Sequence, residues 1–440
     1  MINGKLGLLL AIGMIIVLPV ERWQFSGLGP VDGFIILLIL TAWPVIWRRR
    51  SWVYFPLALA VWLIFIGSLI GALSRLDVGA ALKALLQEVY LFTLLLTMAN
   101  AVVDKKAFLT LNKIWAIVAT MEGVLLILGR IGVTIPILAG GGKAALLGDE
   151  RLSEIGRSVG TFINANAAGG YMMISIFLLL AIPFRSTPRR GAPRYRPVRL
   201  AMIVLLIGGL LSSGSNGALL GLLLGLALAA LYWLHQRGRI ILFMLAMGSL
   251  VVTLLVFSSP LIVSLLSSSS SSGLLVAFSR VDNKLSKRLE LWSASIELAT
   301  KHPTGIGPNV TASVTGIGAH NDYVAFISER GVLGLIGLFV LLGEILFWLV
   351  LAARASRSGS SHLATGALLG GLIGLSVMAA SHEVTHGRAV WLLFAMIFLH
   401  YKFVRSEFGV QGSEFRVRSS EFRVQGSGFG VRSSGFPVPS

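Results

Sequence analysis

The sequence contains no cysteine and few charged residues. The absence of cysteine excludes disulfides, thiolate nucleophiles and cysteine-ligated metals. Charged residues make up 13% of the 440 residues, against roughly 25% in an average soluble domain. Hydrophobic residues make up 55%, and the mean hydropathy is +0.84. Because a bilayer-spanning helix needs about 20 apolar residues, this composition excludes a soluble globular chain. It predicts an all-α integral membrane protein with about twelve transmembrane helices.

Acidic residues are scarcer than basic ones, 19 against 37, which gives a net charge of +18. Such an excess also occurs in nucleic-acid-binding proteins, so the positions of the cations decide its meaning. If the N-terminus is cytoplasmic, seventeen Lys and Arg fall in the six loops predicted inside, and six fall in the short outside loops. Membrane proteins concentrate cations in cytoplasmic loops. We therefore expect both termini in the cytoplasm and no nucleic-acid partner.

Long apolar runs separated by polar clusters mark the expected helices. The first run lacks a small-residue cleavage site and is followed by further runs, which predicts a membrane helix rather than a removed signal peptide. The twelve expected spans are Leu6–Val20, Pro30–Trp47, Trp52–Leu73, Ala80–Val103, Leu111–Val133, Ala165–Phe184, Leu200–Ser213, Ala218–Leu234, Ile240–Phe257, Val332–Ala353, Leu363–Ala380 and Ala389–Val404.

Two predicted outside segments, residues 133–164 and 258–330, are longer than a connection requires. Loops of this length are often functional, so candidate chemistry is sought there first. In the larger loop, before the tenth span, a serine run at 267–272 indicates a flexible tether. Residues 284–301 predict an amphipathic helix that Pro303 stops, followed by a glycine-rich turn.

The C-terminal segment has a different pattern. Five seven-residue copies of the type Ser-(Glu/Gly)-Phe-x-Val-x-x begin at Ser406, Ser413, Ser420, Ser427 and Ser434. Their content of Ser, Gly and Val, with two prolines at the end, argues against a coiled coil. We expect a membrane domain at 1–404 and a disordered low-complexity tail at 405–440.

The larger outside loop concentrates ionisable residues close to the membrane, where such residues are functional candidates by default. Arg288, Trp292 and Ile296 lie at i, i+4 and i+8 and share one helix face. A cation beside an aromatic could hold an anionic head group, and an arginine snorkelling to the interface is the alternative. His320 lies beside Asp322 and could remove a proton from an acceptor hydroxyl. The alternative is a histidine that only caps the following helix.

These residues belong to a set of motifs that resembles the signature of the O-antigen ligase and polymerase superfamily. The resemblance covers residues 50–400 and leaves out the tail. At Ser215-Asn216-Gly217 the chain departs from the Ser-Arg-Gly turn of the family, because Asn216 replaces the usual arginine. The motifs are Gly160-Thr161-Phe162-x-Asn164-x-Asn166, Ser215-Asn216-Gly217, Arg288-x-x-x-Trp292, His302-Pro303-x-Gly305-x-Gly307, His320-Asn321-Asp322-Tyr323 and Glu329-Arg330-Gly331-x-x-Gly334.

The resemblance implies a GT-C-like glycosyltransferase of the bacterial inner membrane, active in lipopolysaccharide or exopolysaccharide biosynthesis. Such enzymes move a glycan from undecaprenyl diphosphate to an acceptor hydroxyl outside the membrane. The acceptor is a glycolipid, a glycan or a protein, and the ligase, the polymerase and the protein O-oligosaccharyltransferase share these motifs. No cofactor and no metal are expected.

The same resemblance suggests the role of each candidate residue. The diphosphate requires a cation, and the planar fork of arginine suits phosphate oxygens. Arg288 is the first candidate for this role, and Arg157 and Arg330 are further ones that could compensate for Asn216. His320 would act as a general base or orient the acceptor. Asp322, Glu329, Glu383 and His386 would lie on the acceptor side or orient it, with Arg388 beside them.

A competing motif lies near the last span. His382-Glu383-Val384-Thr385-His386 matches H-E-x-x-H, which on a helix places two histidines on one face for zinc. A membrane zinc protease is therefore one alternative. Catalytic zinc needs a third protein ligand, and the nearest donor, His400, falls near the other end of the last span. A polar outer turn is the preferred interpretation.

A transporter of polysaccharide-linked lipids is the third class. It predicts charged residues within spans and two similar halves. Lys83, Glu88, Glu122 and Arg130 are the charged candidates, and we expect Lys83 and Glu88 to neutralise each other or a neighbour and Arg130 to snorkel outward. No repeated half is recognisable in the sequence.

Overall fold

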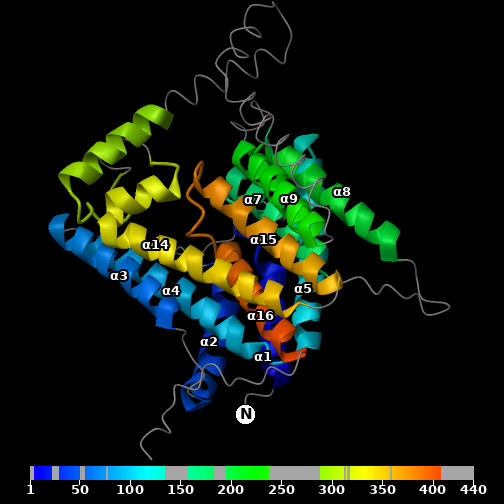
Figure 1. Cartoon of the computed structure of the whole chain (residues 1–440). Helices are drawn as coiled ribbons and strands as arrows, with labels where there is room; N and C mark the ends of the chain where they lie inside the picture. The colour runs from blue at the N-terminus through cyan, green and yellow to red at the C-terminus, as the bar shows by residue number, and fades with distance from the viewer. Residues whose placement is uncertain are drawn as a thin grey trace, which may run out of the picture.

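The computed structural model of the chain contains helices and no strands among the residues it describes (Figure 1). These residues are 4–21, 29–49, 55–75, 78–133, 157–182, 195–236, 288–311, 314, 318–356 and 359–407. The labelled helices are α1 (Gly4–Val17), α2 (Pro30–Arg49), α3 (Phe55–Arg75), α4 (Val78–Ala101), α5 (Lys105–Arg130), α7 (Ala165–Ala181), α8 (Tyr195–Ser213), α9 (Asn216–Gln236), α14 (Asp322–Ala355), α15 (Gly359–Ala379) and α16 (Arg388–Glu407). A further helix spans residues 288–301.

Eleven of the twelve expected spans coincide with these helices, and the ninth, Ile240–Phe257, lies outside the described residues. Three helices begin at least five residues before the expected span: α5 at Lys105 rather than Leu111, α8 at Tyr195 rather than Leu200, and α14 at Asp322 rather than Val332. The difference in α14 arises because this helix consists of two helical segments joined at Gly331 (φ 65°, ψ −167°). The expected span matches the second segment. The serine run and the C-terminal repeats also fall outside the described residues.

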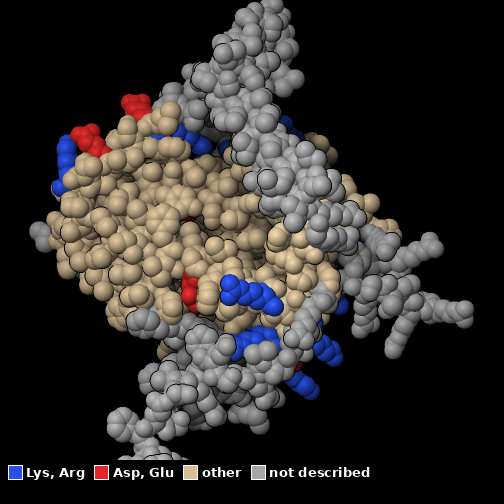
Figure 2. All heavy atoms as spheres, viewed as in Figure 1, with Lys and Arg blue, Asp and Glu red and all other residues tan. Residues whose placement is uncertain are grey.

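The surface of the helix bundle is apolar where a soluble protein would be polar. Leu40, Met121 and Leu200 are 64%, 64% and 63% exposed. In the view of Figure 2, the charged side chains lie toward two opposite ends, with a broad uncharged band between them. Six described helices are long and apolar enough to cross a bilayer, and five shorter apolar helices accompany them. The expected fold class is confirmed: the chain is a multi-pass α-helical membrane protein.

Glycines allow α9 and α15 to pack with their backbones in contact. A Cβ atom on Gly221 would overlap the backbone oxygen of Gly374, and one on Gly225 would overlap that of Gly370. This is the small-residue spacing that brings membrane helices close together. Because the two helices are antiparallel, the start of α9 lies beside the turn of residues 380–387, which follows α15.

A second close pair, α3 with α14, determines the position of the kink at Gly331 (Figure 1). A Cβ atom on Gly67 would overlap the carbonyl oxygen of Arg330, and one on Gly71 would lie 2.6 Å from that of Glu329. The kink frees two carbonyl groups from the helix, and Ile306 and Gly307 donate their N–H groups to Ser328 and Glu329, each at 2.9 Å. The motif at 302–307 therefore lies directly against the motif at 329–334.

Candidate active site

The motif before α7 fixes the start of that helix and one arginine. Thr161 donates its N–H and its hydroxyl to the buried Glu122 carboxylate, both at 2.8 Å. Asn164 caps α7 by accepting the N–H of Ala167 at 2.7 Å. Asn166 accepts a hydrogen bond from Nη2 of Arg157 at 2.6 Å. Both asparagines of the motif therefore have assigned partners, and one of them holds Arg157.

Arg157 lies beside the junction of α8 and α9. Its Nε donates to the carbonyl oxygen of Ser213 at 3.0 Å, and its side chain packs against Gly214 (φ 60°). Asn216, which replaces the arginine of the family motif, is exposed at the first position of α9. Arg157 thus supplies a cation next to the position where this chain lacks one.

The helix over residues 288–301 confirms the described part of the expected amphipathic helix. It lies outside the main bundle, yellow-green at the upper left of Figure 1. Trp292 donates its Nε1–H to the carbonyl oxygen of Ala319 at 3.1 Å, which attaches this helix to the turn that precedes α14. Arg288, one helical turn earlier, is half-buried, whereas Ile296 on the expected common face is exposed. Arg288 is close enough to act electrostatically on His320, which lies in the turn that Trp292 contacts.

His320 occupies that turn with φ 50° and an exposed side chain. Its backbone N–H donates to Oε1 of Glu383 at 3.1 Å. The interpretation of His320 as a helix cap was wrong. Asn321 caps α14, because its side-chain oxygen accepts the N–H groups of Tyr323 at 2.9 Å and Val324 at 3.2 Å.

Asp322 holds the turn of residues 380–387 in place. Its carboxylate accepts the N–H groups of Val384 at 2.9 Å and Thr385 at 3.1 Å, and the hydroxyl of Thr385 at 2.8 Å. The carboxylate of Asp322 is engaged with this turn and forms no hydrogen bond with the ring of His320. Asp322 therefore positions the turn, and Glu383 on that turn reaches the backbone of His320.

The H-E-x-x-H segment is not helical. It lies between the end of α15 at Ala379 and the start of α16 at Arg388, as the polar-turn interpretation predicts. The helical geometry that would bring two histidines to one face is absent here, and the two rings have different surroundings. His382 contacts Ser381 and Gly217, whereas His386 lines a cavity among α3, α4, α14 and α16. The zinc alternative required this segment to be a helix, and the structure shows that it is not.

Four basic side chains, here called the cationic cluster, act on one another electrostatically: Arg157, Arg288, His320 and His382. Partial burial, with repulsion from Arg288 as a further cause, lowers the pKa of Arg157 and also that of His320, which stays partly exposed to solvent. Burial and the repulsion of the other three members lower the pKa of His382 to about 4. Within the described part of the chain, no ion pair joins either arginine to a carboxylate. The cluster is a site with excess positive charge.

Arg330 does not join the cluster, and its expected role at the diphosphate is corrected. It is 1% exposed, and its Nε pairs with Glu88 at 2.8 Å and its Nη1 with Glu329 at 3.3 Å. The guanidinium also stacks on Phe326, 4.4 Å from the ring centroid. Of the two expected ways to neutralise Glu88, by Lys83 or by a neighbour, the structure shows the second: Glu88 pairs with Arg330 and accepts a hydrogen bond from Ser68.

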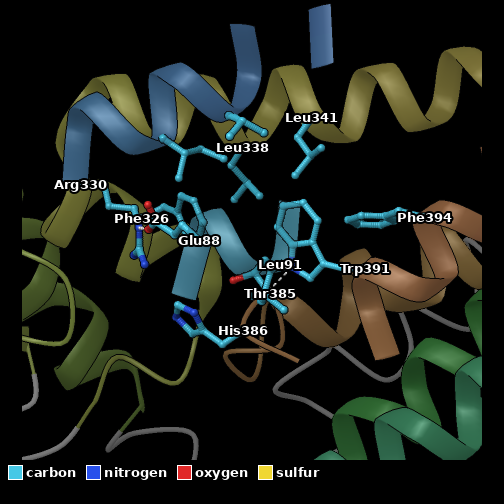
Figure 3. A pocket seen from close by; sticks show the side chains of 12 residues that line it. Glu88, Leu91, Phe326, Arg330, Leu338, Leu341, Thr385, His386, Trp391 and Phe394 are labelled. Carbon is cyan, nitrogen blue, oxygen red and sulfur yellow. Dashed lines mark hydrogen bonds and ion pairs between the residues drawn. The ribbon is translucent and has the colours of Figure 1, made fainter. Parts of the chain in front are cut away.

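Figure 3 shows the cavity beside this arginine, with Arg330, Glu88 and Phe326 on one side and Trp391 and Phe394 on the other. Its volume is about 30 Å³, room for one or two water molecules. Nη2 of Arg330 has no hydrogen-bond partner among the described residues. The cavity is too small for a glycan, so the candidate active site is the cationic cluster and not this space.

Two features that position the site were missed in the sequence. Arg388 forms a bidentate pair with Asp32, at 2.9 and 2.8 Å, and Tyr90 donates to the same carboxylate. Arg388 is therefore held by α2 rather than lining the acceptor side. The Gly67-x-x-x-Gly71 spacing in α3 was a readable signal for close helix packing. The Asp32–Arg388 pair spans most of the chain, and no local pattern marks it.

The fold and the cluster define a multi-pass membrane protein with a basic site at one end of its helices, whose two arginines pair with no carboxylate among the described residues. Residues 201–339 match the family model described as O-antigen ligase. This match confirms the resemblance to the O-antigen ligase superfamily, whose members are membrane glycosyltransferases of the ligase and polymerase type. The matched region contains Asn216, Arg288 and His320, whereas Arg157 and His382 lie outside it. A search of curated proteins found no significant match.

Proposed function

We propose that the protein transfers a glycan from undecaprenyl diphosphate to an acceptor hydroxyl at the outer face of the bacterial inner membrane, without a metal. The superfamily supports the reaction type. The observation that carries the proposal is the cationic cluster, in which Arg157 and Arg288 have no carboxylate partner among the described residues. A site with excess positive charge suits a leaving group that carries several negative charges.

Arg288 and Arg157 bind the diphosphate of the donor. When the bond to the anomeric carbon breaks, negative charge develops on the departing phosphate oxygen. Guanidinium groups stabilise this charge, and each charged hydrogen bond contributes about 1.5 to 3 kcal/mol. Asn166 holds the side chain of Arg157, and Trp292 attaches the helix that carries Arg288. Both arginines therefore reach the diphosphate from supported positions.

His320 contacts the acceptor hydroxyl, either to orient it or to take its proton. Its lowered pKa keeps the imidazole neutral at neutral pH, and a neutral imidazole can accept a hydrogen bond or a proton. Glu383 fixes the backbone of His320. Asp322 supports Glu383 indirectly through the 380–387 turn.

The proposed orientation places the cluster outside and both termini in the cytoplasm. α7, α9, α14 and α16 begin at the end of the bundle that carries the cluster or its supporting turn, and α15 ends there. The opposite end carries Lys105 and Lys106 at the start of α5, Arg354 at the end of α14, and Lys402 and Arg405 at the end of α16. Cations favour the cytoplasmic side, which supports this orientation.

The acceptor distinguishes the three related activities. An O-antigen ligase uses a glycolipid acceptor, a polymerase uses another glycan repeat, and a protein O-oligosaccharyltransferase uses a protein hydroxyl. We propose the ligase, with the polymerase and the protein oligosaccharyltransferase as alternatives within the superfamily. The product of the assay below identifies the acceptor.

The test is transfer by the purified full-length protein in lipid nanodiscs, with undecaprenyl-diphosphate glycan as donor and each acceptor class offered separately. We expect turnover that resists EDTA and falls by about ten- to a hundredfold in Arg288→Gln and in Arg157→Gln, the loss of one charged hydrogen bond. Lys301→Gln is the matched control, because Lys301 lies on the helix of Arg288 and pairs at the surface with Glu297. Undiminished transfer in both arginine variants, or loss of transfer with EDTA, would contradict the proposal.

A further inference from the structure

His382 lies in the cationic cluster but outside every motif that carries the resemblance. Its imidazole packs against the start of α9, where a Cβ atom on Gly217 would lie 2.8 Å from Nδ1. The side chain is 7% exposed. Its ring forms a side-chain hydrogen bond with Ser381, and this bond bears on which ring nitrogen carries the proton.

The bond runs through the hydroxyl of Ser381. That oxygen lies 3.0 Å from the carbonyl oxygen of Met378 and 2.9 Å from Nδ1 of His382. A hydroxyl carries one proton, and a carbonyl oxygen can only accept. If the proton pointed to Nδ1, two oxygens without a hydrogen between them would face each other at 3.0 Å. The carbonyl oxygen of Met378 also accepts the N–H groups of Ser381 and His382, each at 2.9 Å. Donation of the hydroxyl proton to Met378, with the hydroxyl oxygen accepting from Nδ1–H, is the arrangement that satisfies both side-chain contacts, and it leaves Nε2 of the neutral ring without a proton.

We infer that His382, through its bare Nε2, accepts the proton of the acceptor hydroxyl, while His320 orients that hydroxyl. This inference rests on the proposed function and assigns a residue that the family motifs do not contain. In the step, the acceptor oxygen forms a bond to the anomeric carbon of the donor glycan. The bond from that carbon to the phosphate oxygen breaks, and the lipid diphosphate leaves with the electron pair. The proton of the acceptor moves to Nε2 of His382.

The charged groups around His382 link its basicity to donor binding. Arg157 from the segment before α7, Arg288 from the 288–301 helix and His320 from the turn before α14 all disfavour its protonated form. Glu383, the next residue, directs its carboxylate to the N–H of His320. A diphosphate bound to the two arginines would compensate their charge and raise the pKa of His382 from about 4 toward neutrality. The base then becomes effective only when the donor is in place.

Nitrogen NMR of the full-length protein with labelled histidine tests the protonation state directly. The signal of His382 is assigned by its loss in His382→Asn. We expect a protonated Nδ1 and a bare Nε2 at neutral pH, and we expect Ser381→Ala to populate the other tautomer. A proton on Nε2 in the wild-type protein would overturn the inference without affecting the proposed function.

The transfer assay provides the second test. His382→Asn keeps an N–H donor for Ser381 but removes the distal nitrogen, so we expect kcat to fall by about 10² to 10⁴, the usual contribution of a general base, with little change in donor KM. Ser381→Ala keeps the imidazole, and we expect a lower kcat with a shifted pH profile. His362→Asn, at the other end of α15 and bonded to Tyr232, is the control.

The outcomes separate the two proposals. A wild-type protein that transfers no glycan to any acceptor contradicts the proposed function and the inference together. If the wild type transfers glycan and His382→Asn transfers it equally well, the inference fails and the proposed function stands. Loss of kcat in His382→Asn with the folded state preserved, as judged by gel filtration in detergent, supports both.

Discussion

Arginines in two regions of the molecule have opposite electrostatic surroundings. Arg330 is buried against two carboxylates, Glu88 and Glu329, and its charge is matched within the protein. Arg157 and Arg288 lie near two histidines, and no carboxylate pairs with them in the described part of the chain. The residue type is the same in both regions, and the surrounding charges differ.

The presence or absence of a carboxylate partner distinguishes an arginine that stabilises the fold from an arginine that is available to bind a ligand. A buried charge requires a partner, because its desolvation is expensive. The partner of Arg330 is present in the protein, so its removal should affect folding. No carboxylate among the described residues pairs with Arg157 or Arg288, so under the proposed function their removal should affect ligand binding. Each prediction below changes one side of this contrast.

The largest expected effect is on the structural side. Arg330→Met should lower the free energy of unfolding by about 3 to 5 kcal/mol, because it leaves Glu88 buried without its cation. Adding Glu88→Gln should recover part of the loss, since the carboxylate charge is then removed too. Denaturation of the purified protein in mixed micelles measures both variants. Equal stability of the single and double variants would show that the two side chains are not coupled.

The next largest expected effect is a loss of stability in the 380–387 turn. Asp322→Asn removes the charge that accepts three hydrogen bonds from Val384 and Thr385, and should cost about 1 to 3 kcal/mol. We expect faster hydrogen exchange at the amide groups of this turn and a lower kcat, because the turn carries His382 and Glu383. Asn321→Ala, which removes the cap of α14 at a typical cost of about 1 kcal/mol, serves for comparison. Unchanged exchange in the turn would contradict the assignment of Asp322.

The pH dependence of stability tests the histidines of the turn. Burial and nearby cations lower the pKa of His382 to about 4 and that of His386 to about 3. Between these values and about 6.5, the unfolded chain binds protons that the folded chain excludes, so stability should decrease as the pH falls through this range. Each histidine contributes at most about 1.4 kcal/mol per pH unit. Comparing the wild type with the variant carrying His382→Asn and His386→Asn isolates this slope, which should be shallower in the variant.

Arg288→Lys separates the contribution of the positive charge of Arg288 from that of its planar guanidinium group. The variant keeps the charge but loses the planar fork that binds two phosphate oxygens, so we expect a loss of about tenfold in kcat/KM. Its thermal stability should match that of the wild type, unlike that of Arg330→Met. A stability loss comparable to that of the Arg330 variant would place Arg288 on the structural side of the comparison.

The smallest expected effect is a gain in the affinity for the donor. Asn216→Arg introduces the residue of the family turn at an exposed position next to Arg157. A further cation at the start of α9 should lower the donor KM by about threefold to tenfold, the effect of one exposed charged contact. Asn216→Gln, which has a similar chain length without charge, is the control. An unchanged KM in both variants would show that the diphosphate does not reach the start of α9.

Much of the architecture was readable from the sequence, because membrane helices are specified locally. A run of apolar residues long enough to cross the bilayer forms a helix wherever it lies in the chain. Eleven expected spans have helices in the structure, and Pro303 ends the 288–301 helix as predicted. The error at the start of α14 has a local cause: Gly331 interrupts the helix, and the polar residues Ser328, Glu329 and Arg330 separate the short apolar run at 324–327 from the long one that follows.

The site was predictable where a short motif carries its function. Asn164 caps α7, and Gly305 and Gly307 form the turn with φ of 89° and 100°. The roles of single charges were harder to predict. The sequence made Arg288 the first candidate and Arg330 a further one for the same role, and only the carboxylates that approach Arg330 from α4 and from its own helix show that their surroundings differ.

The sequence by itself determined the class of the protein, the helices and the set of basic and acidic residues available to a site, because composition and apolar periodicity act over short stretches of chain. The tertiary structure decided which charges are matched. Glu88 and Arg330 are 242 positions apart, and Asp32 and Arg388 are 356 apart. Helix packing brings each such pair together, and the same packing leaves Arg157, Arg288, His320 and His382 as neighbours. Electrostatic free energy depends on distance in space, and distance along the chain does not reveal it.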